Sequence, residues 1–198
     1  ILISNKNIKF EDLKPNSTIG TSSYRREFQL KQKRSDLNYK LIRGNVDTRL
    51  KKLEEGNYDA IILSKAGIDS LKLSNKITEE FDAEELIPCA GQGIIAIQCR
   101  DSDSNMKEVL ETINDHESRL LAITERGVLK ILEGDCDTAI GVFSNIEGEN
   151  INLVAELFSV DGKKRYFIKE KKNKKFAKEL SKEVGEILKL KSAGSYKR

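Results

Sequence analysis

The feature that most constrains the fold is an alternation of two hydrophobic patterns over residues 17–64. Short apolar runs at 17–19, 39–42 and 58–64 predict strands, and the amphipathic stretches between them predict helices. The last run is apolar almost throughout, as expected for a strand that is covered on both faces. This strand–helix–strand–helix–strand order predicts a parallel-rich sheet covered by helices, and so a chain of the α/β class.

Small hydroxyl residues follow the first predicted strand. Thr21, Ser22 and Ser23 open a helix, where free backbone N–H groups and hydroxyls can bind an anion. Ligands of parallel sheets bind at the carboxyl ends of strands, and the other strands end near Arg43 and Gly67. The sequence therefore predicts an anion-binding site at this edge of the sheet.

Arginines occupy positions where the helix dipole disfavours cations. Arg25 and Arg26 lie in the first turn of the helix that begins at residue 22 or 23, and Arg49 lies in the first turns of the next helix. An anionic partner would compensate these charges. With Arg43 they form a set suited to carboxylates or phosphates. A solvated charged surface is the alternative interpretation.

A different pattern follows residue 92. An apolar segment predicts a further strand with Cys99 in the core, and short alternating runs separated by turns predict antiparallel strands. The last residues, 191–198, are expected to fray. The elements expected here are a strand at 94–99, helices at 105–114 and 118–132, strands at 140–143, 151–159 and 164–171, and a helix at 176–190.

Cys136 lies in an unusual setting for a structural thiol. It stands between Asp135 and Asp137, directly after the helix expected at 118–132. Buried thiols prefer apolar neighbours, and flanking carboxylates disfavour the thiolate that a redox nucleophile needs. Two interpretations stay open: an ordinary loop cysteine, or a fixed attachment point for a group bound elsewhere in the chain.

Composition argues against several classes of protein. The net charge is only +3 and aromatic residues make up 6%, which disfavours nucleic-acid binding. No apolar run is long enough for a membrane span, and the first residues do not resemble a signal peptide. Three cysteines at long spacings suit a reducing compartment. The single histidine, His116, leaves little room for a metal site, so no metal is predicted.

Five motifs, in this order, resemble the porphobilinogen deaminase (hydroxymethylbilane synthase) family. They are GTSSYRR at 20–26, RGNVDTRL at 43–50, YDAIIL at 58–63, GQG at 91–93 and EGDC at 133–136. The resemblance implies a transferase of heme and other tetrapyrrole biosynthesis. Such an enzyme joins four porphobilinogen molecules head to tail into hydroxymethylbilane and releases ammonia. It also implies a dipyrromethane cofactor held by a thioether, and Cys136 matches the position of attachment.

The resemblance also implies roles for individual residues and domains. The implied fold is a periplasmic-binding-protein-like domain plus a small C-terminal α/β domain that carries the cofactor loop. Residues 1–90 would be the second domain of the family, 91–115 a returning strand and helix of the first, and 116–198 the C-terminal domain. The residues implied to bind cofactor carboxylates are Arg25, Arg26, Arg43, Arg49, Thr21, Ser22 and Ser23, with Gly67 and Gln92 lining the same cleft.

The N-terminal region of the family, with its catalytic aspartate, does not match any part of this sequence, which begins without Met. We therefore expect a partial or processed chain that does not turn over alone. Its expected partners are porphobilinogen, the growing polypyrrole chain and the N-terminal fragment. A monomer is expected, in the cytoplasm or in a plastid-type organelle. Asp135, Ser70 and residues 137–139 depart from the usual family pattern.

A binding module of periplasmic-receptor type is the alternative function. It would hold a small polycarboxylate without any chemistry. Cys136 discriminates between the two hypotheses, because a receptor has no use for a thiol at that position.

Overall fold

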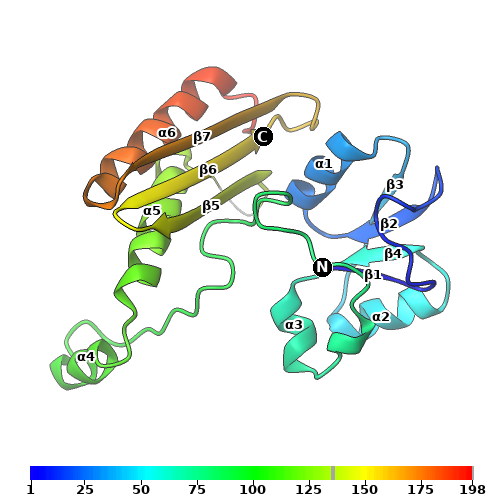
Figure 1. Ribbon diagram of the computed structural model, residues 1–198, viewed down its shortest axis with the longest axis horizontal. Coiled ribbons are helices and arrows are strands. Elements are labelled where there is room, and N and C mark those ends of the chain that lie inside the picture. The colour runs from blue at the N-terminus through cyan, green and yellow to red at the C-terminus, as the bar shows by residue number, and fades with distance from the viewer. Residues whose placement is uncertain (135–136, 198) are drawn as a thin grey trace.

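A four-stranded sheet organises the N-terminal unit of the computed structural model, which describes residues 1–134 and 137–197 (Figure 1). The strand order is β1–β4–β2–β3. Strand β2 (Thr18–Thr21) pairs in parallel with β3 (Asn38–Leu41) and β4 (Ala60–Ile62), whereas β1 (Leu2–Ser4) runs antiparallel to β4. The predicted strand–helix alternation is confirmed, and β1 makes the sheet mixed.

Both faces of this sheet are buried. The apolar residues of β4 alternate between two cores: Ile62 packs with Leu30 on one face, and Ile61 packs with Leu53 on the other. Ile61 and Ile62 are at most 1% exposed, which confirms the strand predicted to be covered on both sides. The helices of this unit are α1 (Tyr24–Lys33), α2 (Val46–Glu54), α3 (Lys65–Ser70) and the 3-10 helix η1 (Ser74–Lys76).

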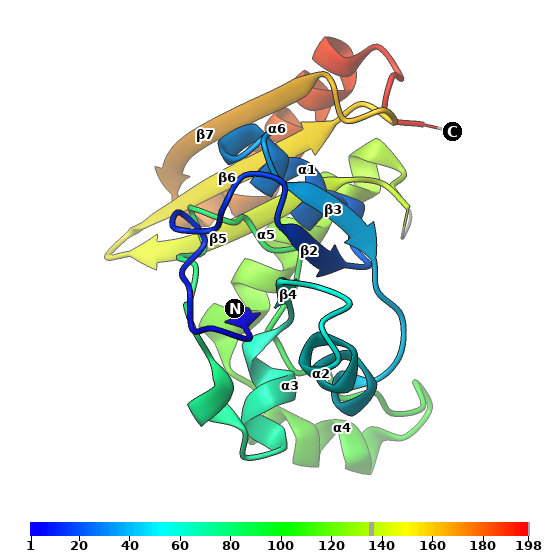
Figure 2. The same ribbon diagram turned by 90° about the vertical axis from the view of Figure 1, so that its right-hand side faces the viewer.

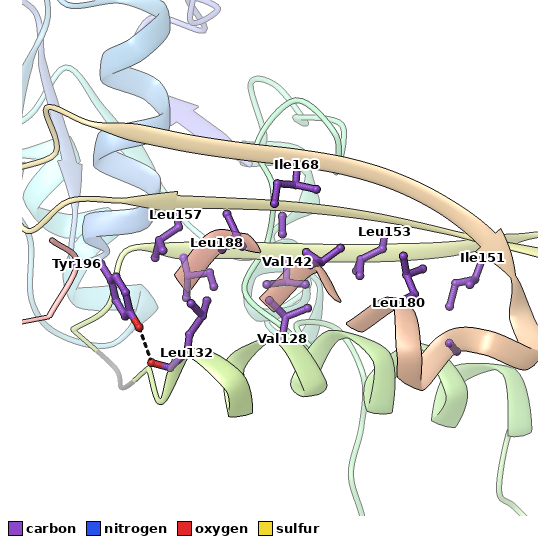
Figure 3. Close-up of a cluster of buried hydrophobic side chains, with 14 residues drawn as sticks. Val128, Leu132, Val142, Ile151, Leu153, Leu157, Ile168, Leu180, Leu188 and Tyr196 are labelled. Carbon is purple, nitrogen blue, oxygen red and sulfur yellow. Dashed lines mark hydrogen bonds between the residues drawn. The ribbon is translucent and has the colours of Figure 1, made fainter. Parts of the chain in front are cut away.

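An antiparallel sheet with the order β5–β6–β7 organises the C-terminal unit. One of its faces is covered by two helices (Figure 3). Val128 and Leu132 of the first helix pack with Val184 and Leu188 of the second against the strands. The predicted strands and terminal helix are confirmed. The elements are α5 (His116–Leu132), β5 (Ile140–Glu147), β6 (Asn150–Phe158), β7 (Arg165–Asn173), η2 (Lys174–Phe176) and α6 (Ala177–Ser192).

Two glycines let α5 and α6 pack closely side by side. A Cβ added at Gly127 would lie 2.4 Å from Ser181 Oγ, and one added at Gly185 would lie 2.7 Å from Ile131 Cβ. From the Gly127–Ser181 contact to the Ile131–Gly185 contact, the residue number rises by four on each helix, so α5 and α6 run parallel. Their backbones therefore approach at one shared seam.

The strand predicted at 94–99 is not formed. These residues make no strand pairing, Ile95 is 88% exposed and Ile97 is 61% exposed, and Cys99 is half-buried instead of lying in the core. An extended segment becomes a strand only where a neighbour satisfies its N–H and C=O groups. No described residue provides that neighbour, so the apolar pattern alone was insufficient. Helix α4 (Ser104–Glu111) follows.

The expectation that the C-terminal residues fray is wrong for most of them. Tyr196 is only 4% exposed and belongs to the core of the C-terminal unit. Its hydroxyl donates to the Leu132 carbonyl oxygen at 2.8 Å (Figure 3), and Val160 N donates to the Ser195 carbonyl oxygen at 2.9 Å. A buried aromatic ring and two hydrogen bonds anchor the segment.

Tyr196→Phe is expected to lower the free energy of unfolding by about 1 kcal/mol. The variant keeps the buried ring but leaves a carbonyl at the end of α5 without its donor. Chemical denaturation measures the loss. Tyr166→Phe is the matched control and should cost less, because among the described residues its hydroxyl bonds only to the Ser195 hydroxyl, at 3.0 Å, which keeps other hydrogen-bonding options. An unchanged free energy in Tyr196→Phe would contradict this account.

Among the described residues, no helix is long and apolar enough to cross a bilayer. That part of the chain also contains no group of three or more His, Cys, Asp or Glu side chains arranged to hold a metal ion.

Candidate functional site

A cavity of about 260 Å³ lies between the two units, where β2 and β4 end. Helix α1 supplies one wall with Arg25 and Arg26, and residues just after β4 supply another. Phe143 of β5 closes it from the C-terminal unit. Figures 1 and 2 show α1 next to the sheet of that unit. The cavity thus occupies the sheet edge that the sequence predicts. Its other polar lining residues are Ser64, Lys65, Glu80 and Gln92.

Hydroxyl groups determine where α1 begins. Ser23 is the N-cap, and its Oγ accepts a hydrogen bond from Arg26 N at 3.4 Å. Thr21 is buried, and its Oγ1 accepts from Ser23 N at 3.2 Å. These two predicted site residues thus have a structural role, which is to place the arginines of the first turn at the cavity.

Arg25 holds a neighbouring segment in place. Its side chain is 5% exposed, Nη1 donates to the Ile87 carbonyl oxygen at 2.5 Å, and Nη2 donates to Gln92 Oε1 at 3.3 Å. Gln29 Nε2 donates to the same carbonyl at 2.9 Å. Burial, followed by the charge of Arg26, lowers the pKa of Arg25 to about 10, so it stays protonated at neutral pH. Carboxylate binding by Arg25 stays a prediction.

Arg26 faces the cavity without a hydrogen-bonding or ion-pairing partner among the described residues. Its guanidinium makes no hydrogen bond or ion pair with any residue in the described ranges, although its side chain is half-buried. Burial lowers the pKa of Arg26; the neighbouring Cys89 partly opposes that shift, and the charge of Arg49 adds to it. A partly desolvated cation without a partner is costly, and an anion in the cavity would offset that cost.

The remaining predicted residues lie outside this cavity. Arg49 donates from Nη1 to Ser22 Oγ at 3.2 Å and from Nε to the Gly44 carbonyl oxygen at 2.8 Å, which joins the starts of α1 and α2. Arg43 is exposed, and its guanidinium forms no hydrogen bond or ion pair with the other predicted residues that the structure describes. Gly67 lies within α3, where an added Cβ would meet Ser64 Oγ at 3.4 Å.

Residues 86–92, here called the bridging segment, are held by both units. Arg25 and Gln29 bind it from α1, as described above. On the other side, Val142 N of β5 donates to the Pro88 carbonyl oxygen at 2.8 Å, and Gly91 N donates to Glu125 Oε2 at 2.7 Å. Gln92, a predicted cleft residue, is therefore positioned by contacts from both sides.

Glu125 of α5 is a site-supporting residue that the sequence interpretation did not identify. It is 5% exposed, and its Oε1 accepts from Ser144 N at 2.8 Å and from Ser144 Oγ at 3.0 Å. Burial raises the pKa of Glu125, and hydrogen bonds from Gly91 and Ser144 partly oppose that shift. The sequence does contain a signal for Glu125. It is a charged residue inside an apolar stripe, at helical spacing from Leu121 and Val128.

Glu125→Ala is expected to lower the free energy of unfolding by about 2–4 kcal/mol, because it removes the acceptor of the backbone N–H groups of Gly91 and Ser144. The raised pKa makes the contribution of Glu125 largest below its usual pKa of 4.5 and smaller as the pH rises through the shifted value. Denaturation at several pH values should therefore show that the difference in the free energy of unfolding between wild type and Glu125→Ala becomes smaller as the pH rises.

The control for this variant is Glu117→Ala, at an exposed position in the first turn of the same helix, which should change the free energy of unfolding by no more than about 1 kcal/mol, the usual contribution of an acid near a helix N-terminus. Equal losses in the two variants would contradict the bridging role of Glu125.

Cys136, the predicted attachment point, lies outside the described residues together with Asp135 and Arg198. The described residues around it belong to the C-terminal unit. Glu133 ends α5 in a left-handed conformation with φ 54°, and its carboxylate accepts from Lys197 Nζ at 2.6 Å. Ala139 packs in a buried cluster with Phe28 of α1 and Phe158. The chain just after Cys136 thus lies against the helix that carries Arg26.

Comparisons with known proteins agree with the predicted family. Residues 1–108 match the family model "Porphobilinogen deaminase, dipyromethane cofactor binding domain", and residues 119–190 match "Porphobilinogen deaminase, C-terminal domain". The porphobilinogen deaminase of Clostridium botulinum is 43% identical over 164 residues, which cover 82% of this chain and 56% of that protein. The one of Exiguobacterium sp. is 39% identical over 164 residues, with 82% and 54% covered.

A third relative, the porphobilinogen deaminase of Francisella tularensis subsp. novicida, is 41% identical over 162 residues, which cover 82% of this chain and 54% of the relative. The chain thus spans about half the length of the curated relatives that it matches. Two matching family models in the expected order, together with about 40% identity to these relatives, show that the chain belongs to the porphobilinogen deaminase family.

Proposed function

We propose that this chain is the cofactor-binding part of a hydroxymethylbilane synthase, which joins four porphobilinogen molecules head to tail and releases ammonia. The observation that carries the proposal is Arg26. It lies half-buried on the wall of a cavity between the two units, and it has no partner among the described residues. A site of this kind suits a ligand with several carboxylates.

The donors at this site fit a dipyrromethane cofactor, whose pyrrole rings carry acetate and propionate groups. Arg26 would bind one carboxylate in a bidentate manner, and Arg49 with its hydrogen-bonded neighbour Ser22 would bind a second. Cys136 would provide the thioether. When bound, the cofactor supplies the pyrrole ring to which the first substrate is joined.

Other residues of the chain would orient the site. Arg25 holds Gln92 at the cavity through the bridging segment, and Thr21 and Ser23 fix the start of α1. Arg43 and Gly67 have the weakest structural support in the predicted set, because neither lines the cavity nor has a side-chain hydrogen bond to another predicted residue in the described part of the chain. They would contribute to a ligand that extends beyond the cavity.

We also propose the family's domain division for this chain: 1–90 as the second domain, 91–115 as a returning strand and helix of the first, and 116–198 as the C-terminal domain. The periplasmic-binding-protein-like architecture is part of this proposal. The exposed apolar residues Ile95, Ile97 and Val109 support it, because they are suited to packing against further protein. A monomer in the cytoplasm is the assembly and location that we propose.

The 198-residue chain alone is expected to release no ammonia from porphobilinogen. Pyrrole condensation needs an acid–base group that stabilises positive charge near the ring nitrogen as ammonia leaves. The only described carboxylate that lines the cavity, Glu80, is already paired with Lys65 at 2.7 Å. Ammonia release should appear when the N-terminal part of a full-length relative is added.

Glu80→Gln is the control for this experiment. It should leave the reconstituted activity largely intact, since Glu80 has no assigned role in the reaction. Sustained turnover by the chain alone that disappears in Glu80→Gln would mean that this carboxylate does the chemistry. No turnover in any reconstituted mixture would contradict the proposed function. No observation favours the receptor-type module over the enzyme.

A further inference from the structure

We propose that the outer surface of α5 and α6 is a docking groove for an acidic amphipathic helix of a partner protein. The groove has a volume of about 980 Å³ and lies on the side of these helices that faces away from the sheet. It shares no lining residue with the cavity between the units. The inference therefore does not depend on the proposed reaction.

Most of the floor of the groove is apolar. It follows the seam where Gly127 meets Ser181 and Gly185 meets Ile131, as described for the fold. Ile123 is 42% exposed at one end, and Ala122 and Leu129 are half-buried beside the seam. The α5 residues that line it run from Arg119 to Ile131, which corresponds to about 18 Å of helix. A partner helix of about three to four turns fits this length.

Basic side chains line both sides of this floor. Arg119, Arg126 and Lys130 recur at helical spacing along α5, and Lys178 and Lys182 lie one turn apart on α6. Within the part of the chain that the structure describes, only Lys182 has an acidic partner, Glu186 at 3.8 Å. Glu133 is the one acidic residue among the described lining residues.

The groove is distinguished by the clustering of its unpaired basic residues. Several lysines elsewhere pair closely with acids, for example Lys169 with Glu84 at 2.5 Å and Lys172 with Glu183 at 2.5 Å, whereas the basic residues of the groove lie together. Four unpaired cations at one groove leave a positive potential that the described residues do not neutralise. Charge complementarity thus calls for an acidic partner.

The shape of the groove favours a helix over other acidic partners. Two basic rows that flank an apolar floor match a helix with one apolar face and acidic residues on either side of it. Single-stranded nucleic acid would need aromatic side chains for base stacking, and none of the described lining residues is aromatic.

A synthetic helical peptide of about 16 residues tests the proposal, with leucines on one face and glutamates on both flanks. Fluorescence anisotropy should show saturable binding to the 198-residue chain that weakens as salt screens the charges. The triple variant Arg126→Glu, Lys130→Glu, Lys182→Glu should bind at least about tenfold more weakly. Ile123→Asp should also weaken binding, through the apolar floor.

The matched control is Lys9→Glu, Lys14→Glu, Lys40→Glu, which makes the same change in net charge at exposed positions of the N-terminal unit. It should bind the peptide almost as well as wild type does. Circular dichroism confirms that each variant is folded. Equal loss of binding in the control, or no saturable binding by wild type, would overturn the proposal.

Three competing ligands test whether another kind of molecule occupies the groove. Heparin and anionic lipid vesicles carry acidic groups but have no apolar helix face. A peptide with the same composition but a scrambled order likewise has the acidic groups without a continuous apolar face. If any of them binds as tightly as the designed peptide, the surface binds polyanions in general and the proposal fails. Self-association of wild type that the groove variant abolishes would make a second copy the occupant and would equally overturn it.

Discussion

Replacement of Cys136 by serine is expected to abolish covalent attachment of a pyrrole cofactor. A thioether needs the sulfur nucleophile, and a serine hydroxyl is far less reactive without a base to activate it. The wild-type chain, produced with the N-terminal part of a full-length relative in a cell that makes porphobilinogen, should show an intact mass raised by one dipyrrole. The Cys136→Ser protein should show the mass of the polypeptide alone.

Cys89→Ser and Cys99→Ser are the matched controls, because they remove the other two thiols. Cys89 is exposed and Cys99 is half-buried, so at least one of them is accessible to a reactive pyrrole. Both variants should retain the added mass. Persistence of the dipyrrole in Cys136→Ser, or its loss in Cys89→Ser, would contradict the assignment of the attachment point.

Arg26→Lys is expected to slow cofactor loading or chain elongation by about 10- to 100-fold. A charge-assisted arginine–carboxylate contact contributes about 1.5–3 kcal/mol, and a lysine cannot reproduce its bidentate geometry. Since Arg26 makes no side-chain hydrogen bond within the described chain, the free energy of unfolding should change by no more than about 0.5 kcal/mol. Dipyrrole occupancy by mass spectrometry and thermal denaturation measure the two effects separately.

The other arginines make this prediction specific. Arg49→Lys should slow cofactor loading or chain elongation by an intermediate amount, since it loses the hydrogen bonds to Ser22 and Gly44. Arg43→Lys should have the smallest effect, because Arg43 is exposed and apart from the cavity. Normal elongation by all three variants would mean that these arginines form only a solvated surface. An effect in Arg43→Lys as large as that in Arg26→Lys would place the ligand elsewhere.

Much of the fold follows from local patterns. The strands and helices between residues 17 and 64, and the antiparallel strands after residue 140, were predicted from the spacing of their apolar residues. These patterns are reliable because each helix or strand buries one or both of its faces, and the spacing of its apolar residues shows how many faces are buried. The predicted parallel pairing of β2 with β3 and β4 is a consequence of the same order.

Two segments show where local patterns are insufficient. Residues 94–99 have the apolar composition of a strand, but strand formation depends on a partner, and no described residue pairs with them. The tail around Tyr196 has the polar composition of a frayed end. It is ordered because one aromatic ring enters the core and its hydroxyl reaches the end of α5.

The sequence by itself determined the family and the class of cofactor, and it predicted an anion-binding site at one edge of the sheet, because residue type and order carry this information. Only the tertiary structure separated the roles of Arg25 and Arg26, which are neighbours in the chain and equivalent in composition. Successive helix residues point about 100° apart. The Arg25 guanidinium therefore donates a hydrogen bond to the bridging segment, whereas the Arg26 guanidinium faces the cavity, where we propose that it binds a ligand.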